Sequence, residues 1–322
     1  MPDTFQGKSS VSTVEWHDNH LSNARCAICK HQQKKTRGDQ TGHLMHIVSY
    51  KHLHCAFFAA ALVACPQFAV AESLPLWEVG IGAAAISFPD YRGSTRRHSY
   101  LLPVPAFVYR GNILQVDREK IRGLLYTGTR TQLDVSINGS VPVRSSGNTV
   151  RQGMPDLDPT LEIGPTLNLL LAENSQSKLS LKLPLRAVIA SDFRSIHNAG
   201  LLANPNLNLD LVSDLGWRLG LVAGVLFGDQ KYHGHFYAVS DQYARPGRPA
   251  YRASGGYSGA QGIVALSRRF ESVWVAGFVK YDALNRAKFE SSPLLGRRNN
   301  LSAGFAVTWT IAKSNTLVAR RE

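Results

Sequence analysis

Hydrophobic and polar residues alternate strictly in several windows of the chain. From Leu133 to Ile137 every second residue is apolar, and the residues between them are polar. A period of two is the signature of a β-strand with two different faces. The pattern predicts strands over residues 131–143, 160–171, 179–189, 206–211 and 217–227. Less regular windows add residues 77–87, 100–109, 112–125, 257–268, 272–282 and 300–311.

These predicted strands are about 10–12 residues long, whereas strands of soluble proteins usually have about five or six. A strand that crosses a membrane needs about 9–11 residues. In lipid every backbone amide must be paired, so strands can span only as a closed barrel. We therefore predict an all-β, antiparallel transmembrane β-barrel, with a soluble periplasmic β-sandwich as the minor alternative.

The windows above give 11 strands, whereas bacterial single-chain barrels have even strand numbers. We expect the missing strand in residues 229–255, around Phe236–Val239, which gives about 12 strands, with 10 as the alternative. The polar faces should line the lumen, with Asp134, Asn138, Glu162, Lys182 and Arg186 among them. Prolines remove ladder donors and predict bulges or rim positions at residues 103, 105, 142, 165 and 184.

A targeting segment precedes the predicted barrel. An apolar run from Cys55 to Cys65 is followed by Pro66 and by an Ala-Val-Ala sequence that ends at Ala71. This order is typical of a secretory signal peptide, with cleavage between Ala71 and Glu72. A competing interpretation treats Leu62–Cys65 as a lipobox. The organisation predicted is an untranslated or disordered extension (1–44), a signal peptide (45–71), the barrel (72–311) and a C-terminal tail (312–322).

Composition narrows the class of partner. Residues 1–71 hold seven Lys and Arg and four Asp and Glu, so residues 72–322 carry 29 basic and 19 acidic side chains, or +10. In an exported chain this charge favours contact with outer-membrane lipid and lipopolysaccharide over nucleic acid. All four cysteines lie within the first 65 residues, which excludes disulfides and cysteine metal sites from the barrel.

Candidate chemistry is sparse. His233, His235 and Ser240 form one cluster, but two histidines are too few for a metal and we expect exposed loop side chains. Asp156 and Asp158, with Glu162 nearby, predict a turn motif or a partner contact. No catalytic residue, cofactor or metal is predicted, and we expect a protein that is not an enzyme.

The closing strand carries a pattern of its own. Its polar-x-Gly-x-x-apolar-x-aromatic order fits an outer-membrane assembly signal, formed by Ser302, Gly304, Val307 and Trp309.

Four segments resemble the MltA-interacting protein family, also called the MipA/OmpV family. They are Trp77–Gly82 with Pro89–Ser94, Gly153–Pro165, Tyr237–Ser240 with Tyr251–Gly256, and Ser291–Leu294. The resemblance implies an outer-membrane scaffold that links a lytic transglycosylase with a bifunctional penicillin-binding protein, a murein synthase. A small outer-membrane channel or a surface adhesin is the alternative function.

Overall fold

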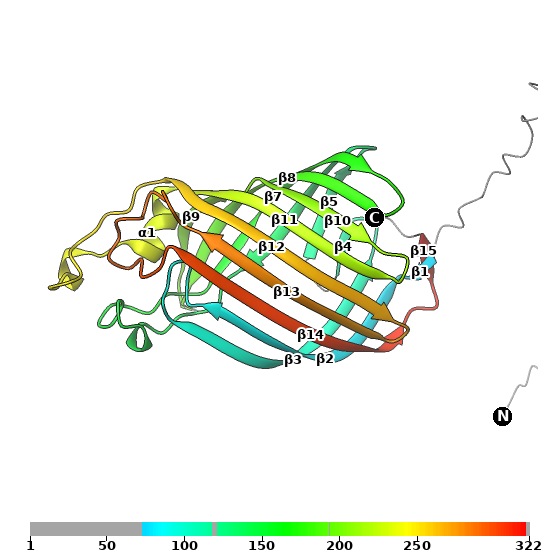
Figure 1. Cartoon of the computed structure of the whole chain (residues 1–322), viewed down its shortest axis with the longest axis horizontal. Coiled ribbons are helices and arrows are strands. Elements are labelled where there is room, and N and C mark those ends of the chain that lie inside the picture. The colour runs from blue at the N-terminus through cyan, green and yellow to red at the C-terminus, as the bar shows by residue number, and fades with distance from the viewer. Residues whose placement is uncertain (1–72, 118–120, 193, 320–322) are drawn as a thin grey trace, which may run out of the picture. The chain divides into compact units, whose positions relative to one another are not determined.

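The computed structural model describes residues 73–117, 121–192 and 194–319. These residues belong to one unit, and most of them form antiparallel strands (Figure 1). Ala71 and Glu72 lie outside the described residues. The strands are β1 (Ser73–Pro75), β2 (Trp77–Pro89), β3 (Arg97–Arg110), β4 (Leu114–Val116), β5 (Ile121–Thr127), β6 (Thr131–Gly139), β7 (Thr160–Glu173), β8 (Ser177–Ser191), β9 (Ile196–Ala203), β10 (Asn206–Val212), β11 (Trp217–Gly228), β12 (Gly256–Phe270), β13 (Val273–Ala283), β14 (Asn299–Lys313) and β15 (Leu317–Ala319).

The strands close into a 12-stranded barrel. β14 pairs with β2 from Ala303↔Ser87 to Lys313↔Glu78, which joins the last long strand to the first. β9 and β10 both pair with β8, because they are one strand interrupted at Asn204 and Pro205. Counted together, they complete an even set of 12 antiparallel strands, and the predicted fold class is confirmed.

The exposure pattern is the reverse of that in a soluble protein. Along β7 the apolar Leu161 and Ile163 are 48% and 37% exposed, whereas the polar Thr160, Glu162 and Thr166 are at most 8% exposed. Lipid can cover the outward apolar side chains, whereas water would leave them unfavourably solvated. This alternation excludes the soluble sandwich.

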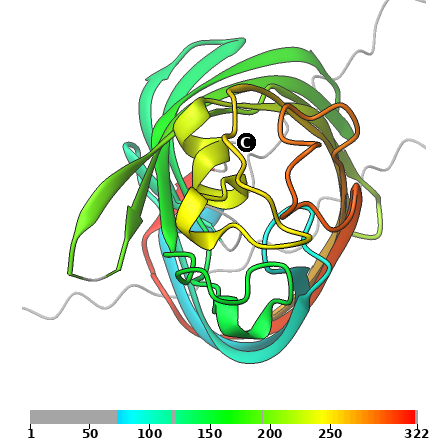
Figure 2. The ribbon, with the colours of Figure 1, turned by 90° about the vertical axis from the view of Figure 1, so that its left-hand side faces the viewer.

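The two ends of the barrel differ. At one end the strands are joined by short turns, and β1 pairs with β15 beside them. At the other end lie the long connections 90–96, 140–159, 229–255 and 284–298 (Figures 1 and 2). Outer-membrane barrels have short periplasmic turns and long extracellular loops. The turn end therefore faces the periplasm and the loop end faces outward.

The position of the twelfth strand was predicted wrongly. Residues 229–255 contain no strand: they form α1 (Gln230–Tyr237), the 3-10 turn η2 (Asp241–Tyr243) and connecting segments. The extra strand comes from residues 112–125, which form the separate strands β4 and β5. α1 replaces the expected strand because Asp229 caps it, accepting a hydrogen bond from the Tyr232 amide. No helix among the described residues is long and apolar enough to cross a membrane.

The end of the last long strand and the pairing near two prolines also bear on the predictions. β14 continues to Lys313, two residues beyond the predicted barrel end, and β15 folds back along β1. The pairing of β7 with β8 breaks near Pro165 and Pro184, as their missing donors predict.

Candidate functional site

The long connections at the loop end fold together into one structure, which we call the loop cap (residues 90–96, 140–159, 229–255 and 284–298). Its apolar core combines buried side chains from all four connections: Tyr91, Val143, Leu157, Tyr237, Leu284, Ala287 and Phe289. The rings of Tyr237 and Phe289 stack with centroids 3.6 Å apart. Figure 2 shows these connections lying across the end of the barrel.

Arg92 links the loop cap to the barrel wall. Its Nε donates to Asp282 Oδ1 at 2.8 Å, and its Nη1 donates to the Ser258 carbonyl at 3.0 Å. The Tyr237 hydroxyl donates to the Arg92 carbonyl at 2.7 Å. Asp282 is 2% exposed, so this ion pair is almost fully withdrawn from water. The Arg92 side chain therefore ties the connection after β2 to β12 and β13, and its backbone carbonyl ties the same connection to α1.

A second polar cluster joins the connections after β2 and β6. The Asn148 amide donates to Asp90 Oδ2 at 2.8 Å and to Ser94 Oγ at 3.1 Å. His98 Nε2 lies 2.8 Å from the other Asp90 oxygen. The Asn300 amide donates to the Ser94 carbonyl at 3.0 Å. Segments more than 200 residues apart in the chain are thus fixed to one another.

His233 is buried in α1, contrary to the expectation of exposed loop histidines. It is 0% exposed, with Nδ1 2.6 Å from the Ser254 carbonyl and Nε2 2.5 Å from Ser258 Oγ. A carbonyl accepts only, so Nδ1 carries the proton and Nε2 accepts from the serine. Burial lowers the pKa of His233. The partner is Ser258, not Ser240, and both side chains are sealed from substrate.

The predicted acidic motif divides between two places. Asp156 lies in the loop cap, where its Oδ1 accepts from the Ser145 amide at 2.7 Å. Asp158 Oδ2 lies 3.9 Å from His197 Nε2, and the His197 and His235 rings are 6.3 Å apart. Glu162 points into the lumen. The three residues therefore do not form one site. Asp156 bonds to an amide 11 positions away, so the turn motif or partner contact stays a prediction.

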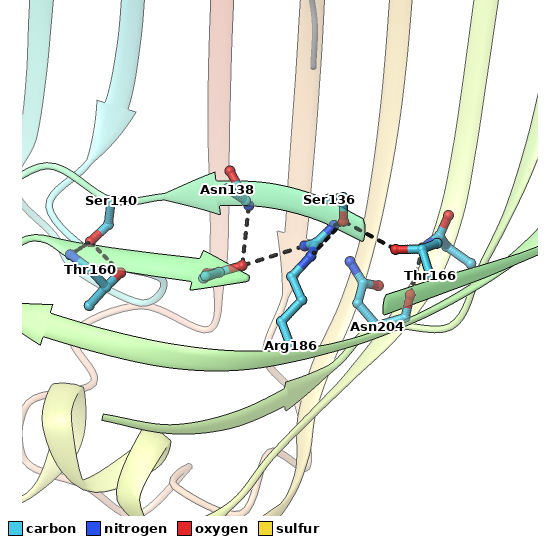
Figure 3. A network of polar contacts seen from close by, with 9 residues as sticks. Ser136, Asn138, Ser140, Thr160, Thr166, Arg186 and Asn204 are labelled. Atoms are coloured by element: carbon cyan, nitrogen blue, oxygen red, sulfur yellow. Dashed lines mark hydrogen bonds and ion pairs between the residues drawn. The ribbon is translucent and has the colours of Figure 1, made fainter. Parts of the chain in front are cut away.

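Glu162 belongs to a polar network on the lumen wall of β6, β7 and β8 (Figure 3). Arg186 Nη1 lies 3.4 Å from Glu162 Oε2, and Arg186 also donates to Ser136 Oγ at 3.2 Å. The Asn138 amide donates to the same Glu162 oxygen at 3.3 Å. Further along the wall, Asn168 donates to Asp134 Oδ2 at 2.8 Å. The network pairs opposite charges, so this wall carries little net charge.

A further ion-pair cluster lies on the lumen side of the wall at the turn end. Glu78 Oε1 accepts from Arg110 Nη2 at 2.7 Å, and Glu78 Oε2 accepts from Arg269 Nη2 at 2.7 Å. Arg269 belongs to β12, whereas Glu78 belongs to β2, and β13 and β14 separate these strands in the barrel wall. The pair therefore bridges β2 and β12 on the lumen side of β13 and β14, and Glu78 is only 1% exposed.

The predicted assembly residues lie on the strand that closes the barrel. β14 pairs with β13 on one side and with β2 on the other. Trp309 is 49% exposed on the outward face, which it shares with Val307. Ser302 faces inward, and a Cβ at Gly304 would lie 2.6 Å from the Phe278 ring. A larger side chain at this inward position would therefore require the Phe278 ring to move.

All four segments that carry the family resemblance reach the loop cap, through Pro89–Ser94, Gly153–Pro165, Tyr237–Ser240 with Tyr251–Gly256, and Ser291–Leu294. Trp77–Gly82, the other part of the first segment, begins β2 at the turn end. The family profile described as MltA-interacting protein MipA matches residues 81–311. The chain belongs to this MipA family. The protein is an outer-membrane β-barrel. No curated protein sequence matches the chain.

Among solved structures, the chain is similar to a NanC porin at 4% identity, with 72% of this chain and 100% of the porin covered and a TM-score of 0.34. The toluene transporter TodX of Pseudomonas putida is 10% identical, with 73% of this chain and 89% of the transporter covered and a TM-score of 0.33. Outer membrane phospholipase A of Escherichia coli is 10% identical, with 74% of this chain and 94% of the phospholipase covered and a TM-score of 0.29. At these values the similarities carry no functional argument.

Sequence reasoning did not find Arg92, Asn148 or Ser258. Each is an ordinary residue in its local sequence, and its partners are between 25 and 190 positions away. The available signal was the resemblance itself, since Arg92 lies within one of the four segments.

Proposed function

We propose that this protein is a non-enzymatic outer-membrane scaffold that links a peptidoglycan lytic transglycosylase with a bifunctional penicillin-binding murein synthase. Membership of the MltA-interacting protein family supports a transglycosylase partner. The cell wall lies on the periplasmic side, so the partners would meet the turn end. That end carries the β1–β15 ladder, whose short strands join residues 73–75 to residues 317–319.

The ladder is held firmly to the barrel. The Leu76 amide donates to the Thr316 carbonyl at 2.9 Å, and the Ser314 amide donates to the Trp77 carbonyl at 2.9 Å. Arg110 donates to the Pro75 carbonyl at 2.6 Å. The free edge of β15, where Leu317 is 58% exposed, can be joined by an extended segment of a partner through backbone hydrogen bonds. The edge of β1 is not available, because Pro75 has no N–H and its carbonyl accepts from Arg110. We infer that this ladder is the docking element.

The interior weighs against the channel alternative. The four connections of the loop cap pack on one another at one end of the barrel, and the Glu78–Arg269 pair projects into the lumen at the other end. A narrow 12-stranded lumen restricted at both ends is suited to a structural role. Burial of His233 and Ser258 supports the absence of enzymatic activity, because no substrate could reach this pair.

Affinity purification of the detergent-solubilised protein tests the proposal. The full chain should recover both a lytic transglycosylase and a penicillin-binding protein. A chain ending at Ser314, which lacks β15, should lose them while still migrating as a folded, heat-modifiable barrel. Recovery of neither enzyme by the full chain would refute the scaffold, and equal recovery by the shortened chain would refute the ladder.

A further inference from the structure

β3 has an edge with almost no strand partner. On one side it pairs with β2 along its whole length, from Trp77↔Tyr109 to Pro89↔Arg97. On the other side only Tyr109 and Arg110 have partners, in the three-residue strand β4. Within the described residues, no strand pairs with this edge of β3 from residue 97 to 108. The wall between β3 and β6 is therefore incomplete toward the loop end.

Two prolines show that this edge is built to stay unpaired. The Arg110 amide donates to the Leu76 carbonyl, so even-numbered residues of β3 direct their amides toward β2. Odd-numbered residues, including Pro103 and Pro105, direct their nitrogens toward the free edge. Proline has no N–H, so its placement here costs the β2 ladder nothing and removes two donors that a pairing strand would need.

Both faces of β3 are apolar and uncovered beside this edge. The outward Leu101 is 78% exposed, and the inward Leu102 and Tyr100 are 46% and 39% exposed. Two consecutive residues of a strand face opposite sides of the barrel wall. In a closed wall they would not both be exposed, because side chains inside the lumen would cover the inward one. The polar lumen wall of β6 to β8, with Glu162 at 8%, shows the contrast. An alkyl chain suits the β3 surface, and a polar ligand does not.

Cationic side chains lie directly above this apolar stretch. Arg96 and Arg97 are exposed where β3 begins. A Cβ at Gly147 would lie 2.8 Å from the Arg96 guanidinium carbon, and Gly147 belongs to the connection that follows β6. Arg96 therefore lies against the loop cap, at the loop end of the β3 edge. Arginine binds phosphate well, because its planar fork of donors matches the phosphate oxygens.

We propose that the gap beside β3 is a lateral opening that binds lipopolysaccharide, the phosphorylated lipid of the outer leaflet. Arg96 and Arg97 bind a phosphate, and one acyl chain enters between β3 and β6 across Leu101 and Leu102. The loop end faces outward, which places the arginines at the level of the outer-leaflet headgroups. A second copy of the chain is the weaker alternative occupant, because the prolines prevent edge-to-edge pairing.

The first experiment asks whether lipid reaches the inward face of β3. Nitroxide labels are attached to Leu102→Cys and, as a control, to Ala306→Cys, in full chains whose four native cysteines are serine. Ala306 also faces inward, but β14 has partner strands on both sides. In lipopolysaccharide-containing vesicles, oxygen should relax the label at 102 at least threefold more than a water-soluble nickel chelate does. The label at 306 should favour nickel. If both labels were relaxed more by the nickel chelate than by oxygen, the proposal would be overturned.

The second experiment identifies the lipid. Native mass spectrometry of protein extracted from outer membranes should show bound lipopolysaccharide, and Arg96→Gln with Arg97→Gln should reduce it at least fivefold. The matched pair Arg297→Gln with Arg298→Gln, exposed at the same end, should keep it. Bound phospholipid alone, a dimer without lipid, or equal loss in both pairs would each overturn the proposal. None of these results depends on a wall-enzyme partner, so the scaffold proposal is tested separately.

Discussion

The ion pair between Arg92 and Asp282 should determine how firmly the loop cap is held. Replacing one partner of a buried pair typically costs about 3–5 kcal/mol, because the other charge is left without compensation. In Arg92→Met, Lys280 would remain 3.4 Å from Asp282, which lessens the penalty. We therefore expect about 3 kcal/mol, or about a 100-fold rise in the opening equilibrium of the cap, since 1.4 kcal/mol is tenfold.

Hydrogen exchange followed by mass spectrometry measures this opening segment by segment. Exchange in residues 90–96 and 284–298 should accelerate in Arg92→Met, while exchange in the strands β7 and β8 stays unchanged. The exposed Arg297→Ala should change the free energy of opening by less than about 0.5 kcal/mol.

A double variant separates the ion pair from simple loss of packing. Arg92→Met with Asp282→Leu removes both charges, so its cost should be smaller than the sum of the single variants by about 0.5–3 kcal/mol. Strict additivity of the single effects, or unchanged exchange in the cap of Arg92→Met, would refute the reasoning.

Further predictions concern the cap, the lumen, assembly and export. Burial lowers the pKa of His233 from its usual 6.5, so the stability it contributes is complete above that pH and falls as the pH drops. The opening equilibrium of the cap, obtained by dividing exchange rates by the intrinsic amide rate at each pH, should therefore rise at pH 5, and a flat profile would contradict this. Glu78→Ala should raise single-channel conductance in planar bilayers from near zero, and unchanged recordings would show that the pair does not restrict the lumen. Trp309→Ala should lower the heat-modifiable, assembled fraction several-fold, whereas normal assembly would remove Trp309 from the insertion signal. N-terminal sequencing of the outer-membrane protein should begin at Glu72, and a lipid-modified Cys65 would support the lipobox instead.

The barrel itself could be predicted from sequence because membrane strands obey a local rule. Leu161, Glu162 and Ile163 alternate in the chain as they alternate between lipid and lumen in the structure. The strand count was right although one position was wrong. β4 has only three residues, and three consecutive apolar residues, Leu124–Tyr126, interrupt the period of two in β5. α1 contains the aromatic residues that made residues 229–255 resemble a strand.

The loop cap could not be predicted, because its contacts are distant in sequence. Asn148 meets Asp90 across 58 positions, and Arg92 meets Asp282 across 190. No pattern of local spacing carries that information. The prolines at 103 and 105 did carry a signal, but the sequence predicted a bulge or a rim position. Only the strand pairing shows that both nitrogens face an unpaired edge.

Photo-crosslinking in living cells tests the central claim most directly, because it reports which end of the barrel meets the wall enzymes. A photoreactive residue at Ser272, exposed at the turn end, should capture a lytic transglycosylase or a penicillin-binding protein. The same residue at Asn285, exposed in the loop cap, should capture neither. Capture of a wall enzyme from Asn285, or the absence of both enzymes from the Ser272 products, would contradict the account.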